Sequence, residues 1–229
     1  MLRSKLKTED TGKMFEKGLC MALGIAYDGP YKYGMELPTK LQPRLQKLCG
    51  QFMTQPYVHT AKRGARYDYT SSEDPNLHFS AKSIKKGGGK VAPQVIGQAT
   101  PKKFCEVLAI PFTDVPALKL HIQENIHTIL PHLVSYTFDC PNVYFNEQKD
   151  TIAYITLTKP IDWSLYEYEW TCPALEWNNS STVKIKTPTG PVSLVEFQFH
   201  TKSRQNMAVR WCYENFLTLF KDNLTVVPF

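Results

Sequence analysis

The stretch "LHFSAKSIKKGGGKVAPQVIGQ" (residues 77–98) starts as a strand and ends as a loop rich in lysine and glycine. Residues 76–84 alternate apolar and polar side chains, which is typical of a half-buried strand. The glycines at 87–89 break that pattern. The preceding segment "ARYDYTS" (65–71) also reads as a strand, and the turn-forming "SEDP" joins the two. We call these two strands the central strands, because most of what the sequence says about function depends on them.

Other apolar patterns surround this pair. Residues 8–23 and 40–53 carry apolar side chains at helical spacing, and residues 28–43 read as a loop rich in glycine and proline. Further helices are expected to start within 100–109 and to cover 115–135, with strands over 142–158, 182–187 and 192–200 and a core-packing helix over 204–220. The order of elements predicts an α/β (α+β) fold, a mixed central sheet flanked by helices.

Length and composition set the broad class of protein. The chain has 229 residues, of which 42% are hydrophobic, and this suits a single globular domain over 1–229. We find no apolar run long enough to span a membrane and no secretion signal near the start. The six cysteines contain no C-x-x-C pair, which favours reduced thiols and a cytoplasmic location.

The positive charge is concentrated in one segment. The chain carries a formal net charge of +6, and the 31 residues from Pro75 to Cys105 hold six lysines and no acidic residue. Such a local excess suits a polyanion, since each phosphate that is neutralised releases condensed counterions. A solvated basic loop on an ordinary soluble protein is the alternative.

Three residues on the two central strands could carry chemistry. Side chains at i and i+2 of a strand point the same way, so Ser80 and Lys82 share a face, with Ala81 opposite. Asp68 on the preceding strand comes close to them if the strands pair. A carboxylate that holds Mg²⁺ and a lysine that orients water are the groups that metal-assisted phosphodiester hydrolysis needs. The alternative for Asp68 and Lys82 is a cross-strand ion pair.

The spacing of Asp68 and the x-x-Lys that ends at Lys82 resembles the PD-(D/E)xK nucleases, especially type II restriction endonucleases. The run "RYDYT…LHFSAKSIKKGGGKVAPQVIGQAT…KKF" and the later "VEFQFHTKSRQNMAVRW" (195–211) are similar to segments of such enzymes. The resemblance implies a restriction-endonuclease-like fold with its catalytic core at about 60–110. It also implies Mg²⁺-dependent cleavage of double-stranded DNA at specific sites. A palindromic site is read most simply by a homodimer.

The sequence departs from that pattern at two positions. Tyr67 stands where the family usually has proline, and Ser80 stands where it has a metal-binding Asp or Glu. The resemblance therefore implies either that an acid from elsewhere completes the site or that the site works with fewer charged ligands. The candidates are Glu16, Glu36, Glu106 and Glu196, with the Ala81 carbonyl, water and phosphate oxygens as further ligands.

Two sets of polar residues are candidates for contacting DNA. Glutamine can bond adenine in the major groove and lysine neutralises phosphates. The first set follows the strand 76–84 and consists of Lys85, Lys86, Lys90, Gln94 and Gln98. The second set lies in the strand and helix region 182–222 and consists of Gln198, His200 and Arg204. Glu196 and Gln198 could also form an alternative active strand, but the partner strand of their hairpin supplies no aspartate. Loop solvation and an ordinary amphipathic strand are the structural alternatives.

Three hypotheses follow. The first is a Mg²⁺-dependent site-specific endonuclease of the restriction type with Asp68, Ser80 and Lys82 in the catalytic site and Asp68, Glu16 and Ala81 as metal ligands. The second is a non-catalytic DNA-binding protein that uses the basic segment 82–103. The third is a structural or scaffold protein in which residues 77–98 are only a surface loop.

Overall fold

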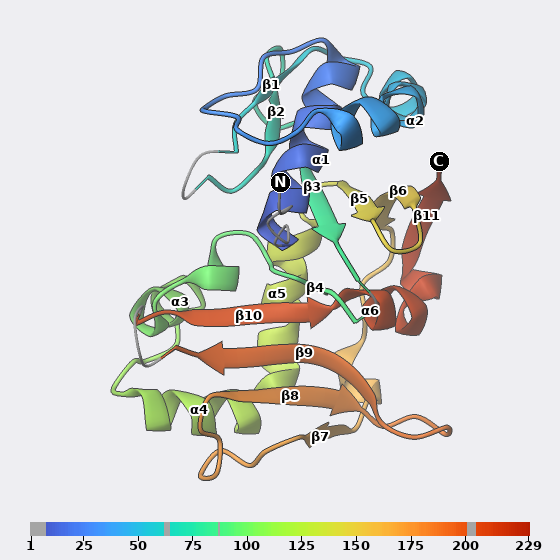
Figure 1. Cartoon of the computed structure of the whole chain (residues 1–229). Helices are drawn as coiled ribbons and strands as arrows, with labels where there is room; N and C mark the ends of the chain where they lie inside the picture. Colours follow the sequence, from blue (N-terminus) through green and yellow to red (C-terminus); the bar gives the residue numbers. More distant parts are fainter. Residues whose placement is uncertain (1–7, 62–64, 87, 201–204) are drawn as a thin grey trace, which may run out of the picture. The chain divides into compact units, whose positions relative to one another are not determined.

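The computed structural model describes residues 8–61, 65–86, 88–200 and 205–229. These form two compact units, each built from segments that are distant in the sequence (Figure 1). The first unit comprises Met1–Gly89, Cys140–Thr158 and Leu224–Phe229, and the second comprises Lys90–Asp139 and Lys159–Asn223. The assignment of 1–229 to a single nuclease domain stays a prediction.

The first unit contains a mixed sheet, which confirms the predicted fold class. Its strand order within the described residues is β1-β2-β3-β5-β6-β11. The strands are β1 (Tyr57–His59), β2 (Tyr69–Ser71), β3 (His78–Ile84), β5 (Asn142–Asn146), β6 (Thr151–Leu157) and β11 (Leu224–Pro228). Strand β3 pairs antiparallel with β2 and parallel with β5. The two central strands therefore pair, which is the condition for the expected approach of Asp68 to Ser80 and Lys82.

Two helices supply the core of the first unit. Helix α1 (Thr8–Leu23) has the predicted bounds, whereas α2 (Glu36–Phe52) starts earlier than the predicted residue 40. Proline is tolerated in a first helical turn, where no helix bond is lost, so Pro38 does not prevent the earlier start. Phe15 of α1 stacks on Phe145 of β5 with ring centroids 5.4 Å apart. This contact between distant segments fixes α1 on the sheet.

The second unit contains an antiparallel sheet with the order β4-β10-β9-β8-β7 among the described residues. The strands are β4 (Lys90–Val91), β7 (Tyr168–Trp170), β8 (Ser180–Ile185), β9 (Val192–Phe199) and β10 (Met207–Cys212). The helices are α3 (Pro101–Val107), α4 (Val115–Glu124), α5 (Ile126–Phe138) and α6 (Tyr213–Leu219). The predicted hairpin about "TPTG" is confirmed as β8 and β9.

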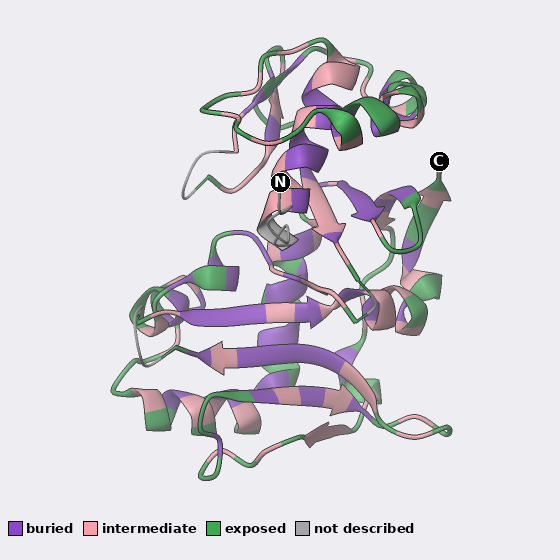
Figure 2. Ribbon diagram, in the orientation of Figure 1, coloured by how far each residue is buried: buried purple, intermediate pink, exposed green. Residues whose placement is uncertain are grey.

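The helix predicted over 204–220 is wrong in its first half. Residues Met207–Cys212 form strand β10, which pairs with β9, and only Tyr213–Leu219 are helical. Met207, Val209 and Trp211 recur every second residue and are buried. Val209 also lies four residues before Tyr213, so it fits a helical period by coincidence. Strands β9 and β10 are buried along most of their length (Figure 2).

Two other predicted elements are divided in the structure. The strand expected over 142–158 is the hairpin of β5 and β6, whose turn contains Asp150 at a positive φ of 49°. The helix expected over 115–135 is α4 and α5, separated at Asn125. Within the described residues no helix is both long and apolar enough to cross a bilayer.

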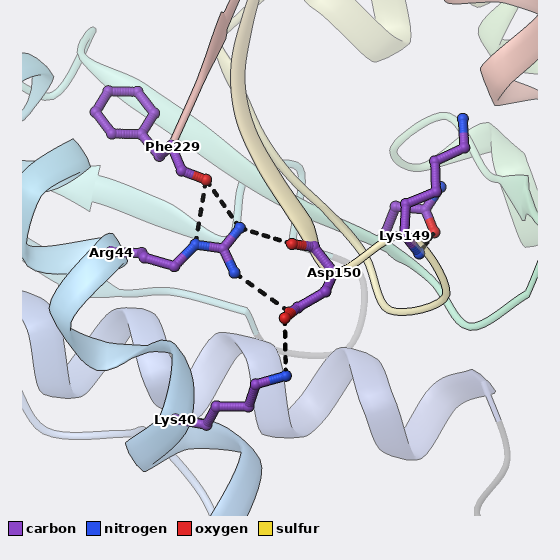
Figure 3. Close-up of polar contacts among 6 residues, drawn as sticks. Lys40, Arg44, Lys149, Asp150 and Phe229 are labelled. Carbon is purple, nitrogen blue, oxygen red and sulfur yellow. Dashed lines mark hydrogen bonds and ion pairs between the residues drawn. The ribbon is translucent and has the colours of Figure 1, made fainter.

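An arginine on α2 ties the β5–β6 turn to the end of β11 (Figure 3). Arg44 donates to the Asp150 carboxylate and main-chain oxygen at 3.2 and 2.9 Å, and to the main-chain oxygen of Phe229 at 2.8 and 3.1 Å. Lys40 adds an exposed ion pair to Asp150 at 2.9 Å. Hydrogen bonds from Lys40, with Arg44 beside it, hold the pKa of Asp150 below 3.8.

Replacing Arg44 with methionine keeps the aliphatic stem and removes all of these bonds. After allowance for solvent screening we expect a loss of about 2 kcal/mol, or roughly 4 °C in Tm by thermal melting. Lys40→Met is the matched control and should change Tm by about 1 °C or less, because exposed pairs contribute little. Since the pKa of Asp150 is depressed, the Arg44 effect should be present above pH 3.8 and shrink below it. Equal Tm values for the parent and Arg44→Met would contradict this account.

Candidate active site

Asp68 and the strand after it meet directly. Asp68 lies just before β2, and its Oδ2 accepts a hydrogen bond of 2.8 Å from the backbone N–H of Ala81 on β3. The register of the two strands causes this, because Tyr69 is opposite Phe79 and the next pair outward is Asp68 with Ser80. The half-buried Asp68 is therefore fixed beside the x-x-Lys segment.

Burial and the charges of Lys82, Glu16 and Lys13 act on the Asp68 carboxyl group. Burial raises its pKa above 3.8, and the strongest opposing influence is the positive charge of Lys82, which lowers it. The negative charge of Glu16 raises it again. Lys82 and Glu16 thus each lie within electrostatic reach of Asp68, although the three residues come from a strand, a helix and a loop. The sequence placed Asp68 and Lys82 together and could only name Glu16 as a candidate.

Glu16 is buried on α1 and faces two basic side chains. Its Oε2 lies 2.9 Å from Lys13 Nζ and 3.6 Å from His59 Nε2. The backbone N–H of Asp28 donates to His59 Nδ1 at 3.0 Å, so the proton of a neutral His59 ring is on Nε2, toward Glu16. Burial lowers the pKa of Lys13, but the charge and hydrogen bond of Glu16, together with Tyr27 and Asp68, hold that pKa above 10.5.

Lys13 and His59 are not predicted as site residues from the sequence. Lys13 has a local signal, since a residue three positions before Glu16 lies on the same helical face. His59 has no local signal in the sequence, because only the folding of the sheet brings β1 close to Glu16 on α1.

The other residues named for this site have different surroundings. The Ser80 side chain is fully buried, and its hydroxyl oxygen accepts a hydrogen bond from the Cys140 thiol at 3.7 Å. Glu36 is exposed at the start of α2, and Glu106 pairs with Lys103 on α3. Glu196 lies in the second unit. In the described parts of the chain, no three His, Cys, Asp or Glu side chains gather as a metal-binding group.

The lysines after β3 divide between the units. Lys85 is half-buried and Lys86 is exposed in the first unit. Lys90, in the second unit, lies 2.6 Å from the Glu196 carboxylate. Gln98 is exposed, whereas Gln94 is buried at 8% relative exposure, which favours a packing role over base reading for Gln94.

A polar cluster lies on strands β4, β9 and β10. The Arg210 guanidinium donates to Glu196 and, at 2.6 Å, to Gln198. Burial raises the pKa of Glu196, but the bonds and charges of Lys90 and Arg210 together hold it below 4.5. His200 is exposed after β9, and Arg204 lies outside the described residues. Arg210 was not named from the sequence, although a basic residue opposite Glu196 is what a buried carboxylate requires.

Comparison with known proteins identifies a protein that is similar to this chain. The chain is 42% identical over 224 residues to the type II restriction enzyme CviAII of Paramecium bursaria Chlorella virus 1. This chain is a relative of a type II restriction enzyme. The likeness covers 96% of the chain, and hence both units, and 63% of the length of CviAII. No family model and no solved structure matches the chain.

This restriction-enzyme relative has the mixed sheet flanked by helices that the resemblance to restriction endonucleases implied. Asp68, just before β2, and Lys82, on β3, are the two charged residues of the motif that suggested the resemblance. The fold and the similarity to CviAII therefore support the same reading of the sequence.

Proposed function

We propose that the chain is a site-specific endonuclease that hydrolyses phosphodiester bonds of double-stranded DNA with Mg²⁺. The observation that carries the proposal is the 42% identity to CviAII over 96% of the chain. CviAII is a type II restriction enzyme by name, and the chain spans only 63% of its length. The activity is therefore a proposal for this chain, and the charged groups that it contains itself add support to it.

The residues present fit a magnesium ion. Burial and, as a smaller cause, the negative charge of Glu16 raise the pKa of Asp68, and a divalent cation would stabilise the charged form of both carboxylates. Mg²⁺ prefers oxygen ligands and is commonly bound through one or two carboxylates together with water and phosphate. Asp68, Glu16 and the Ala81 carbonyl would hold the ion. When bound, it would polarise the phosphate and lower the pKa of a water ligand.

The side chains around these carboxylates have separate roles in the proposal. Lys82 orients the attacking water and offsets the charge that develops on the phosphate oxygens. Lys13 and His59 fix the Glu16 carboxylate through the contacts described above. The buried Ser80 occupies the position of the usual acid and packs against Cys140. Its place in the catalytic site stays a prediction.

The remaining predictions concern DNA and assembly. Exposed residues of the two polar sets are proposed to contact DNA, chiefly Lys86, Gln98 and His200. A homodimer that reads a palindromic site and a cytoplasmic location are proposed with them. The concentration of lysines in residues 82–103 favours one alternative, a non-catalytic DNA-binding protein.

One experiment separates these functions. The protein is incubated with a long DNA of known sequence and Mg²⁺, and the ends of the fragments are sequenced. We expect the same short DNA sequence to be present at every cut. DNA that is retained at low salt, released steeply by added salt and left uncut with every divalent ion would instead establish the non-catalytic alternative.

A further inference from the structure

A tyrosine-rich loop follows α1 in the first unit. The sequence "YDGPYKYG" (residues 27–34) forms no helix or strand, yet internal contacts hold it in place. The Tyr27 and Tyr31 rings pack edge to face at 5.5 Å, and Tyr31 packs in the same way on Tyr33 at 5.6 Å. The Tyr31 hydroxyl donates to the Gly34 carbonyl at 2.8 Å. The aromatic rings are therefore positioned before any ligand arrives.

This loop and α1 enclose a pocket of about 400 Å³. Its wall includes the side chains of Lys13, Tyr27, Asp28, Pro30, Lys32 and Tyr33. The pocket thus combines two ammonium groups with two phenol rings and has one exposed carboxylate, that of Asp28. Aromatic rings and cations together are what proteins use to bind unpaired nucleotides, because each base has a face that stacks and each phosphate is an anion.

The pocket borders the candidate active site. Lys13, in its wall, lies 2.9 Å from the Glu16 carboxylate. Tyr27, also in the wall, stacks on His59 with centroids 4.6 Å apart and an interplanar angle of 27°. His59 in turn faces Glu16. A ligand in the pocket would therefore lie next to the proposed metal-binding carboxylate.

The Tyr27 and Tyr31 phenols stay uncharged over the physiological range because their pKa values are raised. Burial, with the neighbouring phenols and Glu36, raises the pKa of Tyr31 to about 12. Burial is also the main cause that raises the pKa of Tyr27, and the charge of Glu16 adds to it. The rings therefore present no negative charge to a phosphate.

We infer that this pocket binds one unstacked nucleotide of the DNA strand, beside the phosphate that is cut. The base stacks on Tyr27 and Tyr33, and its phosphate is held by Lys13 and Lys32. A base inside a duplex offers only its edges in the grooves, whereas a concave pocket with aromatic walls receives a base that has left the stack. This inference rests on the proposed function.

The test uses photo-cross-linking without any metal. The full chain is mixed in EDTA with 30-base-pair duplexes of random central sequence that contain 5-iododeoxyuridine in place of thymidine. It is then irradiated, and the cross-linked peptides are mapped by mass spectrometry. We expect cross-links within residues 27–34. DNA that binds by fluorescence anisotropy but cross-links only elsewhere would overturn the pocket and leave the proposed function standing. A chain that does not bind DNA at all would overturn both.

Variants supply a second readout. Tyr33→Ala should weaken DNA binding about tenfold and remove the cross-links, whereas Lys32→Gln should reduce the slope of log K against log salt by about 0.9. Lys186→Gln, at an exposed ion pair in the second unit, is the matched control and should leave both unchanged. Thermal melting confirms that each variant is folded. Wild-type affinity, salt slope and cross-links in folded Tyr33→Ala and Lys32→Gln would contradict the inference.

Discussion

Lys82→Ala is expected to reduce the rate of DNA cleavage about a thousandfold, because an ammonium that stabilises developing charge in a partly buried site contributes on this scale. The structure places this charge beside Asp68, where it is the largest influence that opposes burial. Alanine keeps the strand conformation of β3 and removes only the ammonium and its stem. The side chain is half-buried, so its loss leaves the core of the first unit intact.

The measurement is the single-turnover cleavage rate of a DNA that carries the site identified from fragment ends. DNA affinity in EDTA is measured in parallel and should change by less than about threefold, since one phosphate contact is a small part of the total. Lys159→Ala, an exposed lysine in the second unit, is the matched control and should cut like the parent. Cleavage by Lys82→Ala at the parental rate would remove Lys82 from the mechanism.

Asp68→Asn is expected to reduce the rate of DNA cleavage about as much as Lys82→Ala does. It is not expected to lower the thermal stability of the metal-free protein. Asparagine retains an oxygen that can accept the hydrogen bond from Ala81 N–H, but it loses the charge needed to hold a cation. The change in Tm on substitution distinguishes a carboxylate that stabilises the fold from one that serves function. Removing a stabilising ion pair lowers Tm, whereas removing a carboxylate whose charge is disfavoured by the fold does not.

The pKa gives the direction of this effect. Burial, which outweighs Lys82, raises the pKa of Asp68 above 3.8 in the folded protein, so the native state binds more protons than the unfolded chain between the two values. The Asp68 contribution to stability therefore falls as pH rises through that window, and it is unfavourable at neutral pH. Asparagine cannot ionise and removes this dependence.

Thermal melts between pH 4 and 8 check the prediction, with Asp150→Asn as the matched control. The pKa of Asp150 is lowered by Lys40 and Arg44, so its substitution should lower Tm at neutral pH, the opposite sign to Asp68→Asn. Asparagine also tolerates the positive φ at position 150, so the backbone adds no strain. If Asp68→Asn also melts several degrees below the parent at neutral pH, the Asp68–Lys82 pair is structural.

Local patterns in the sequence were sufficient for part of this description. The helical spacing of Phe15 and Leu19 predicts α1, and the alternation of residues 76–84 predicts β3. Both patterns depend only on neighbours along the chain and on which side is buried. The turn between residues 71 and 76 then makes the pairing of β2 and β3 the simplest arrangement, and the proximity of Asp68 to the Lys82 segment follows from it.

What the sequence determined by itself is thus the mixed fold class and the short-range pair of Asp68, just before β2, and Lys82, on the adjoining strand β3. The tertiary structure alone decided that Glu16 lies within electrostatic reach of Asp68, that His59 faces Glu16, and that Met207–Cys212 is a strand beside β9. These contacts join segments tens of residues apart or select one of two periods that the same apolar residues satisfy. The free energy that settles them comes from burial in the completed core, which no local window of sequence contains.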